Sequence, residues 1–169
     1  MHSFRSQSRG DSRRKVASSR ELSPLARLIH ALQQEGIRFQ VAGMSAAILQ
    51  GVPSTTIDTD LWVNLKERQC VRILHLCQKL GATLMSPTVV ALSDDTIVNF
   101  LYRVNGLKSF EEEWKNAVRL RWLQTTVAVL PLERIIRSKE FVRRPKDLAH
   151  LPLLRQILHL RRKLRTSDG

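Results

Sequence analysis

The sequence lacks any long apolar segment and contains little cysteine. No apolar run approaches the roughly 18 residues that a transmembrane helix requires, so we expect no membrane span or membrane partner. The N-terminus has no apolar segment either, which argues against a secretory signal and favours a cytoplasmic location. Cys70 and Cys77 stand seven residues apart in a helical pattern, about 10.5 Å along the axis, too far for a disulfide. No second cysteine pair offers a zinc site.

Acidic residues are few compared with basic ones. The chain has 28 lysines and arginines against 15 aspartates and glutamates, a net charge of +13 at pH 7. Residues 1–20 carry about +5 of this charge and residues 151–169 about +4. Such basic ends favour contact with a polyanion such as RNA. The alternative is that both ends are solvated and only aid solubility.

Length and composition indicate one folded domain. A chain of 169 residues with 43% hydrophobic content is long enough to bury a core. Residues 1–21 contain few apolar groups and are predicted to form a disordered basic tail. We expect the folded domain to cover residues 22–154. Residues 155–169 would form the basic end of a C-terminal helix and a tail.

Helical and strand patterns alternate along the domain. Ser23 and Pro24 suit the N-cap and first position of a helix that ends at Gly36. A segment closed by Gly81 repeats its apolar residues at helical spacing and suits a crossover between strands. We expect an α/β or α+β domain, a mixed sheet with flanking helices. The predicted strands are residues 39–42, 57–63, 88–93, 96–102, 118–123 and 125–130; the predicted helices are 24–36, 44–50, 67–80, 110–116, 131–141 and 145–164, the last bent or restarted at Pro152.

Two aspartates on one predicted strand give the clearest chemical signal. Residues 57–63 alternate, so that Asp58, Asp60 and Trp62 share one face. Carboxylates at positions i and i+2 have Cα atoms about 6.5 Å apart, close enough to share a hard divalent cation such as Mg²⁺. The alternative is a solvated strand end.

The turn at Gly43 joins a predicted buried strand to a short helix. Its backbone amides and the Ser45 hydroxyl suit phosphate binding at the start of that helix. An ordinary strand-to-helix turn is the alternative interpretation.

An ordered series of motifs resembles the nucleotidyltransferase superfamily. The series contains a glycine turn followed by a short helix, then the pattern Asp-x-Asp on a strand, and it continues to a basic segment near residue 145. The resemblance is to small bacterial nucleotidyltransferase-like proteins related to toxin–antitoxin nucleotidyltransferases, and it covers roughly residues 37–154. It rests on Ala42-Gly43-Met44-Ser45, Asp58-Thr59-Asp60, Asn99-Phe100-Leu101, Gly106, residues 110–114, Pro131-Leu132-Glu133, Lys139 and Arg144-Pro145-Lys146-Asp147.

The resemblance implies an enzyme that transfers a nucleoside monophosphate from a nucleoside triphosphate to an acceptor hydroxyl. RNA or tRNA is the candidate acceptor, and a cognate antitoxin or toxin protein is a candidate partner. Asp58 and Asp60 would hold Mg²⁺, and Asn99 stands where relatives have a third catalytic carboxylate. Ala42 likewise replaces the first glycine. These departures leave open a second possibility, a weak or inactive member that binds nucleotide or RNA without turnover.

The predicted nucleotide-binding residues are Gly43, Ser45, Lys139, Arg144 and Lys146. The three basic side chains suit a triphosphate or an RNA backbone, although a solvated basic face would have the same composition. Asp147 either complements the start of its helix or pairs with Arg144.

Overall fold

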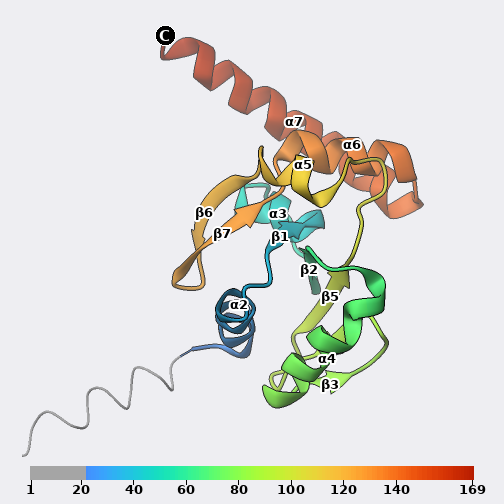
Figure 1. Ribbon diagram of the computed structural model, residues 1–169. Coiled ribbons are helices and arrows are strands. Elements are labelled where there is room, and N and C mark those ends of the chain that lie inside the picture. The colour runs from blue at the N-terminus through green and yellow to red at the C-terminus, as the bar shows by residue number, and fades with distance from the viewer. Residues whose placement is uncertain (1–21) are drawn as a thin grey trace, which may run out of the picture.

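The computed structural model describes residues 22–169, and the predicted tail at residues 1–21 lies outside the described residues. Six α-helices and one 3₁₀ turn surround the sheet in this part of the chain (Figure 1). The helices are α2 (Pro24–Gln34), α3 (Gly43–Leu49), α4 (Cys70–Lys79), α5 (Phe110–Trp114), α6 (Leu132–Val142) and α7 (Pro145–Ser167), and the 3₁₀ turn is η1 (Glu67–Gln69). The strands are β1 (Phe39–Ala42), β2 (Asp58–Val63), β3 (Thr83–Leu84), β4 (Val89–Ala91), β5 (Ile97–Leu101), β6 (Val118–Trp122) and β7 (Thr125–Val129).

The seven strands form one mixed sheet in the order β3-β4-β5-β2-β1-β7-β6. Strand β1 pairs antiparallel with β2 and parallel with β7, and β2 pairs parallel with β5. The β4–β5 and β6–β7 pairs are antiparallel. Between the parallel strands β2 and β5 the chain passes through α4, which is the expected crossover helix. The structure therefore confirms the predicted mixed sheet with flanking helices.

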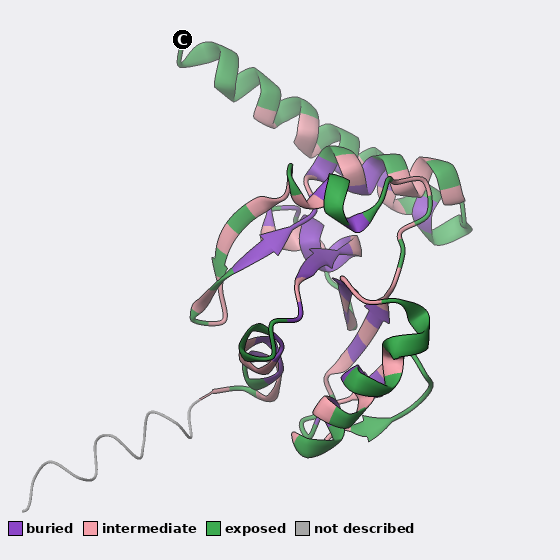
Figure 2. Cartoon of the chain, viewed as in Figure 1, coloured by how far each residue is buried: buried purple, intermediate pink, exposed green. Residues whose placement is uncertain are grey.

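The core lies around the central strands. All four residues of β1 are buried, and so is the apolar face of α2 (Figure 2). Trp62 of β2 packs edge to face against Phe110 of α5, with ring centroids 5.4 Å apart. Burial of this apolar surface is the main stabilising contribution, and it fixes the register of the strands that carry the polar site.

The structure differs from the sequence predictions at a few element boundaries. Strand β3 was not predicted, because its two residues are exposed and carry no alternating pattern. The expected helix over residues 67–80 divides into η1 and α4. Pro131 is the N-cap of α6 and not its first residue. Helix α7 continues through Pro152 instead of restarting there, and it extends to Ser167, beyond the predicted end.

Helices α6 and α7 pack together beside the sheet, and the C-terminal turns of α7 project away from the body (Figure 1). Those turns are exposed after Arg161. Among residues 22–169, no helix combines the length and the apolar character needed to cross a membrane.

Candidate active site

A cavity of about 650 Å³ opens where β2 and β5 run side by side. Asp58 and Asp60 enter it from β2, and Asn99 enters it from β5. Gly43, the end of α6 and the start of α7 also line it. The structure thus brings most of the predicted site residues together: Gly43, Asp58, Asp60, Asn99, Lys139, Arg144 and Lys146 all line the cavity.

Asp60 and Asn99 are directly opposite one another in the parallel β2–β5 pair. The Asn99 side-chain amide donates a hydrogen bond to Asp60 Oδ1 over 3.2 Å. Burial raises the pKa of Asp60, and the negative charge of Asp58 raises it further. The Asn99 hydrogen bond and the charges of Lys146 and Lys139 oppose this rise in pKa. Ionised Asp60 is therefore held in an unfavourable environment that a bound cation would relieve.

Asp58 is the first residue of β2 and follows directly on an exposed loop. The hydroxyl of Thr56 donates to Asp58 Oδ1 over 3.0 Å, which restricts the carboxylate to one orientation. Its neighbour Ile57 is 92% exposed although it is a large apolar residue. Both features belong to the loop that precedes β2, and Thr55, Thr56 and Ile57 of this loop line the cavity together with the two carboxylates.

Gly43 allows the close approach of Asp60. It adopts a left-handed conformation with φ of +57°, and a Cβ atom placed there would overlap Asp60 Oδ2. A side chain at position 43 would therefore both strain the backbone and displace the carboxylate.

We expect Gly43→Ala to destabilise the protein. The left-handed backbone costs about 1–2 kcal/mol for a residue with a Cβ, and displacement of Asp60 adds to this. Gly36→Ala is the matched control, because Gly36 also has a positive φ (+68°) but no atom lies within 4 Å of the place that a Cβ would occupy. Chemical denaturation should show a larger decrease in the free energy of unfolding for Gly43→Ala than for Gly36→Ala. Equal losses would show that the Asp60 contact has no energetic effect.

Ser45 does not reach the cavity lining. Its side chain is buried, and its hydroxyl donates to the backbone carbonyl of Asp58 over 3.0 Å. This bond ties α3 to the start of β2. The hydroxyl is thus occupied by the backbone, and its observed contact positions Asp58 rather than a ligand.

Lys139, Arg144 and Lys146 form a basic wall of the cavity, and a buried carboxylate holds two of them in place. Asp147 is 1% exposed and accepts hydrogen bonds from Lys139 Nζ at 3.2 Å and Arg144 Nε at 2.9 Å. It also accepts from the Arg144 backbone amide at the start of α7, so both interpretations of Asp147 hold. Burial alone would raise the pKa of Asp147, but the hydrogen bonds and charges of Arg144 and Lys139 outweigh it and lower the pKa. Asp147 therefore stays ionised and holds both cations at the cavity.

Sequence reasoning missed two ionisable residues that line the cavity, His150 and Arg103. His150 Nδ1 lies 3.3 Å from Lys139 Nζ, so Nδ1 accepts and the ring proton resides on Nε2. Burial, with the charge of Lys139, lowers the pKa of His150, so the imidazole is neutral at pH 7. The spacing of four residues from Lys146 along α7 could have revealed His150. Nothing in the sequence around Arg103 marks it.

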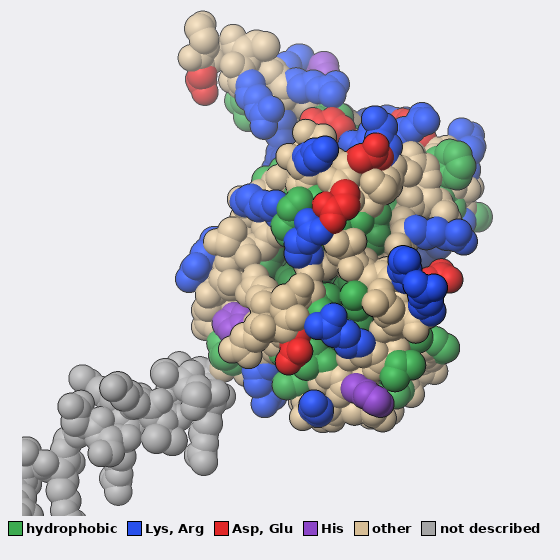
Figure 3. Space-filling view, in the orientation of Figure 1, with side chains coloured by type: hydrophobic (Ala, Val, Ile, Leu, Met, Phe, Trp, Pro, Cys, Tyr) green, Lys and Arg blue, Asp and Glu red, His purple; other side chains and the backbone are tan. Residues whose placement is uncertain are grey.

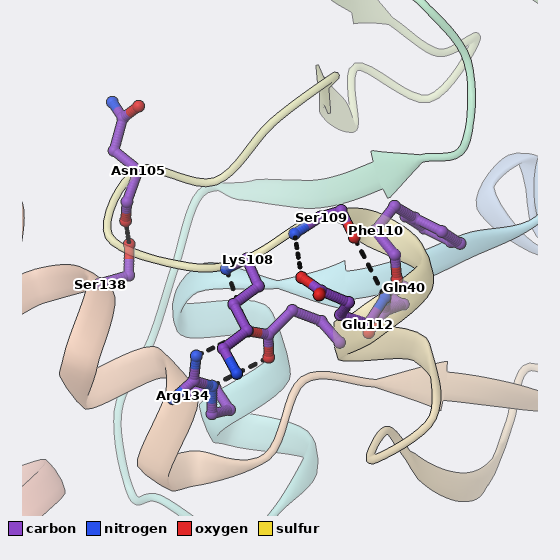
Figure 4. Close-up of polar contacts among 9 residues, drawn as sticks. Gln40, Asn105, Lys108, Ser109, Phe110, Glu112, Arg134 and Ser138 are labelled. Atoms are coloured by element: carbon purple, nitrogen blue, oxygen red, sulfur yellow. Dashed lines mark hydrogen bonds and ion pairs between the residues drawn. The ribbon is translucent and has the colours of Figure 1, made fainter.

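The loop that carries Arg103 is anchored to α6 and α5 (Figure 4). Ser138 donates to the carbonyl of Asn105 over 2.8 Å. Buried Glu113 pairs with Arg134 at 2.6 Å and accepts from the backbone amide of Lys108. These contacts hold the loop against α6, and the apolar side chains of Val104 and Leu107 pack against the core beside them.

The donor set suits a hard divalent cation with substrate ligands. Asp58 and Asp60 supply carboxylate oxygens on one face, and Mg²⁺ is commonly held by one or two carboxylates together with phosphate oxygens and water. Over residues 22–169 no cluster of three or more His, Cys, Asp or Glu side chains could form a complete metal site. The remaining ligands of a cation here would have to come from a bound phosphate group and water.

Two solved structures of the antibiotic-resistance factor ANT(2″)-Ia, an aminoglycoside nucleotidyltransferase, share this architecture. Its solution structure has a TM-score of 0.54 and 13% sequence identity, and the match covers 89% of this chain and 94% of that chain. The crystal structure in complex with adenylyl-2″-tobramycin has a TM-score of 0.52 and 15% identity, covering 87% and 100%. At these identities the likeness establishes the fold, and the chain therefore has a nucleotidyltransferase-like fold.

A crystal structure of a Thermotoga maritima protein assigned to the nucleotidyltransferases has 17% identity and a TM-score of 0.45, covering 84% of this chain and 91% of that chain. No protein-family model matches the sequence, and no curated protein matches it in sequence.

Proposed function

We propose that the protein transfers a nucleoside monophosphate from a nucleoside triphosphate to an acceptor hydroxyl, with Mg²⁺ held by Asp58 and Asp60. The observation that carries this proposal is the convergence of two carboxylates and three basic side chains on one cavity within a nucleotidyltransferase-like fold. The carboxylates lie about 80 residues before the basic side chains in the sequence, so the fold is what assembles them.

In the proposed reaction an acceptor oxygen forms a bond to the α-phosphorus of the triphosphate. The bond between the α-phosphorus and the bridging oxygen breaks, and pyrophosphate leaves with the electron pair of that bond. The hydroxyl proton passes to solvent. Mg²⁺, when bound, would offset the negative charge that develops on the phosphate oxygens.

The chain's own residues would bind and orient the triphosphate. Lys139 and Arg144, held by Asp147, present positive charge from one wall, and exposed Lys146 adds to it. The neutral His150 would donate a hydrogen bond from Nε2 to a phosphate oxygen. Gly43 would allow the triphosphate to approach the backbone beside Asp60.

The charge of the cavity favours an anionic acceptor such as RNA. Its only carboxylates among the described lining residues are Asp58, Asp60 and Asp147. The first two would face the metal, and Asp147 is already paired with two cations. No carboxylate among these lining residues is left to bind a polycationic aminoglycoside, whereas exposed Arg103 has no carboxylate partner within residues 22–169 and could contact a phosphate.

The projecting end of α7 carries several Lys and Arg side chains on its surface (Figure 3). Helix α7 begins at the cavity wall with Lys146 and ends in exposed basic turns. Within the described chain no carboxylate pairs with its last four basic side chains, Arg161, Arg162, Lys163 and Arg165. A long polyanion such as tRNA could therefore contact the cavity and α7 at once.

Incubation with α-labelled nucleoside triphosphate, Mg²⁺ and an acceptor tests the proposal. We expect label to enter total RNA and not tobramycin, because the cavity repels polycations. The products would be separated by gel electrophoresis and thin-layer chromatography. Label in tobramycin would overturn the acceptor assignment, and no transfer to any acceptor would overturn the enzymatic proposal.

The second candidate function is nucleotide or RNA binding without turnover. Asn99 favours it, because an amide carries no charge and cannot accept the proton of the attacking hydroxyl. In either case the resemblance to toxin–antitoxin nucleotidyltransferases suggests a role as one component of such a pair. Nucleotide binding with no transfer in the labelling experiment would favour this second function.

A further inference from the structure

One hydroxyl group of the chain lies directly beside a carboxylate of the candidate active site. Thr56 comes two residues before Asp58, is exposed, and lines the cavity. Its Oγ1 atom lies 3.0 Å from Oδ1 of Asp58 and 3.2 Å from the backbone carbonyl oxygen of the same residue. Because the proposed transfer takes place at this carboxylate, Thr56 presents an alcohol where an acceptor hydroxyl is needed.

Two other residues with hydroxyl groups line the cavity within residues 22–169, Thr55 and Ser138. The Ser138 hydroxyl donates to the backbone carbonyl of Asn105, so it is engaged by the loop after β5. The Thr55 side chain makes no hydrogen bond to the described part of the chain. Of the three hydroxyl groups, only that of Thr56 is held against a carboxylate of the site.

The segment that carries Thr56 is accessible. Residues 52–56 adopt no regular secondary structure, and residues 55–57 are all exposed. Val52 is the buried residue of this segment, and it lies four positions before Thr56. A group attached to the Thr56 hydroxyl would therefore lie in the cavity or in solvent and would displace no core side chain.

We propose that the protein transfers a nucleoside monophosphate to its own Thr56. The inference rests on the proposed function and adds an acceptor within the chain itself. Oγ1 of Thr56 forms a bond to the α-phosphorus of the bound nucleoside triphosphate, and the bond between the α-phosphorus and the bridging oxygen breaks. Pyrophosphate leaves with the electron pair of that bond, and the hydroxyl proton passes to solvent. The product is a phosphodiester that joins Thr56 to the nucleoside.

Proximity favours this acceptor over an external one. An acceptor held in the site makes the step intramolecular, which avoids the entropy cost of bringing two reactants together. This advantage partly offsets the lack of a base at Asn99. The attached nucleotide would stay beside Asp58 and exclude the next triphosphate, so the modification would inhibit further transfer.

The competing explanation is that Thr56 only orders the loop. Its two hydrogen bonds join residues i and i+2, a local arrangement that threonine commonly forms in turns. In that case the protein would carry no covalent nucleotide after incubation with a triphosphate. Replacement of Thr56 would then affect only stability and the orientation of Asp58. Covalent labelling distinguishes the two explanations.

The experiment incubates the full chain with each of the four α-labelled nucleoside triphosphates, Mg²⁺ and total RNA. We expect protein label that survives denaturing electrophoresis, with a mass increase of one nucleotide unit that peptide mapping assigns to Thr56. Thr56→Val should lose the label, and Thr56→Ser should keep it because serine retains the hydroxyl. Ser54→Ala is the matched control, since Ser54 belongs to the same segment but does not line the cavity, and it should be labelled like wild type.

A mixing experiment identifies the chain that supplies the acceptor. An intramolecular step is first order, so the labelled fraction at a given time should not change with protein concentration. Asp60→Asn should remain unlabelled, both alone and when mixed with Thr56→Val. Label on Asp60→Asn in the mixture would mean transfer between two copies and would overturn the intramolecular step. Label on Asp60→Asn alone would show that the modification does not come from this site.

The RNA in the same reaction separates this inference from the proposed function. Label in RNA but not in the protein would overturn self-modification and leave the proposed function standing, whereas label in neither would overturn both. Label that persists in Thr56→Val, or that maps to Thr55, would overturn the assignment to Thr56. Peptide mapping of the wild type decides the site even if Thr56→Val folds poorly.

Discussion

Replacing Asp58 or Asp60 by asparagine should abolish the thermal stabilisation that a nucleoside triphosphate gives in the presence of Mg²⁺. A ligand at about 100 times its Kd stabilises the folded state by about 2.7 kcal/mol. For a domain of this size that corresponds to a rise in Tm of roughly 5–10 °C. Loss of one carboxylate removes a charged ligand of the cation and with it most of the affinity for the metal–nucleotide complex. Differential scanning fluorimetry with and without ligand measures the shift.

Without ligand, we expect Asp60→Asn to be as stable as the wild type or slightly more stable. The reason is that burial and the neighbouring Asp58 already disfavour the charged form of Asp60. Asp95→Asn is the control, because Asp95 is an exposed turn residue with a positive φ that asparagine tolerates. This control should respond to nucleotide like wild type. A full ligand shift in both Asp58→Asn and Asp60→Asn would show that the nucleotide binds elsewhere.

Replacing Asn99 by aspartate should raise the rate of transfer by at least about tenfold. General-base assistance is worth typically about 10²–10⁴-fold, and a carboxylate at position 99 can accept a proton where an amide cannot. Position 99 is well placed for this role, because Asn99 lies opposite Asp60 in the β2–β5 register and contacts Asp60 Oδ1. Single-turnover assays with labelled nucleoside triphosphate would measure the change.

The same substitution should lower the stability of the ligand-free protein. It removes the hydrogen bond donated to Asp60 and places a third negative charge beside two others. Addition of Mg²⁺ should restore the lost stability. Asn99→Ala is the control, since it removes the hydrogen bond without adding a charge or a base, and it should give no gain in rate. Robust transfer by the wild type, with no increase in Asn99→Asp, would contradict the role proposed for position 99.

Local patterns were enough to predict most of the helices and strands. The alternation over residues 57–63 placed Asp58 and Asp60 on one face, and both line the cavity. The Ser23 N-cap and the Gly43 turn were likewise predicted from residue types whose preferences are local. Element ends were predicted less accurately, because the two exposed residues of β3 carry no alternating pattern and α7 continues through Pro152.

The sequence by itself determined the mixed α/β composition, the pair of carboxylates and the basic character of the chain, because periodicity and residue type specify them. Only the tertiary structure decided which residues meet. The β2–β5 register brought Asn99 to Asp60, and the packing of α6 against α7 buried Asp147 between Lys139 and Arg144. Elsewhere in the fold the Ser45 hydroxyl donates a hydrogen bond to the backbone carbonyl of Asp58, and Arg119 lies over the ring of Trp114. Most of these contacts join segments far apart in the chain, and their geometry follows from burial of the shared core and not from any local pattern.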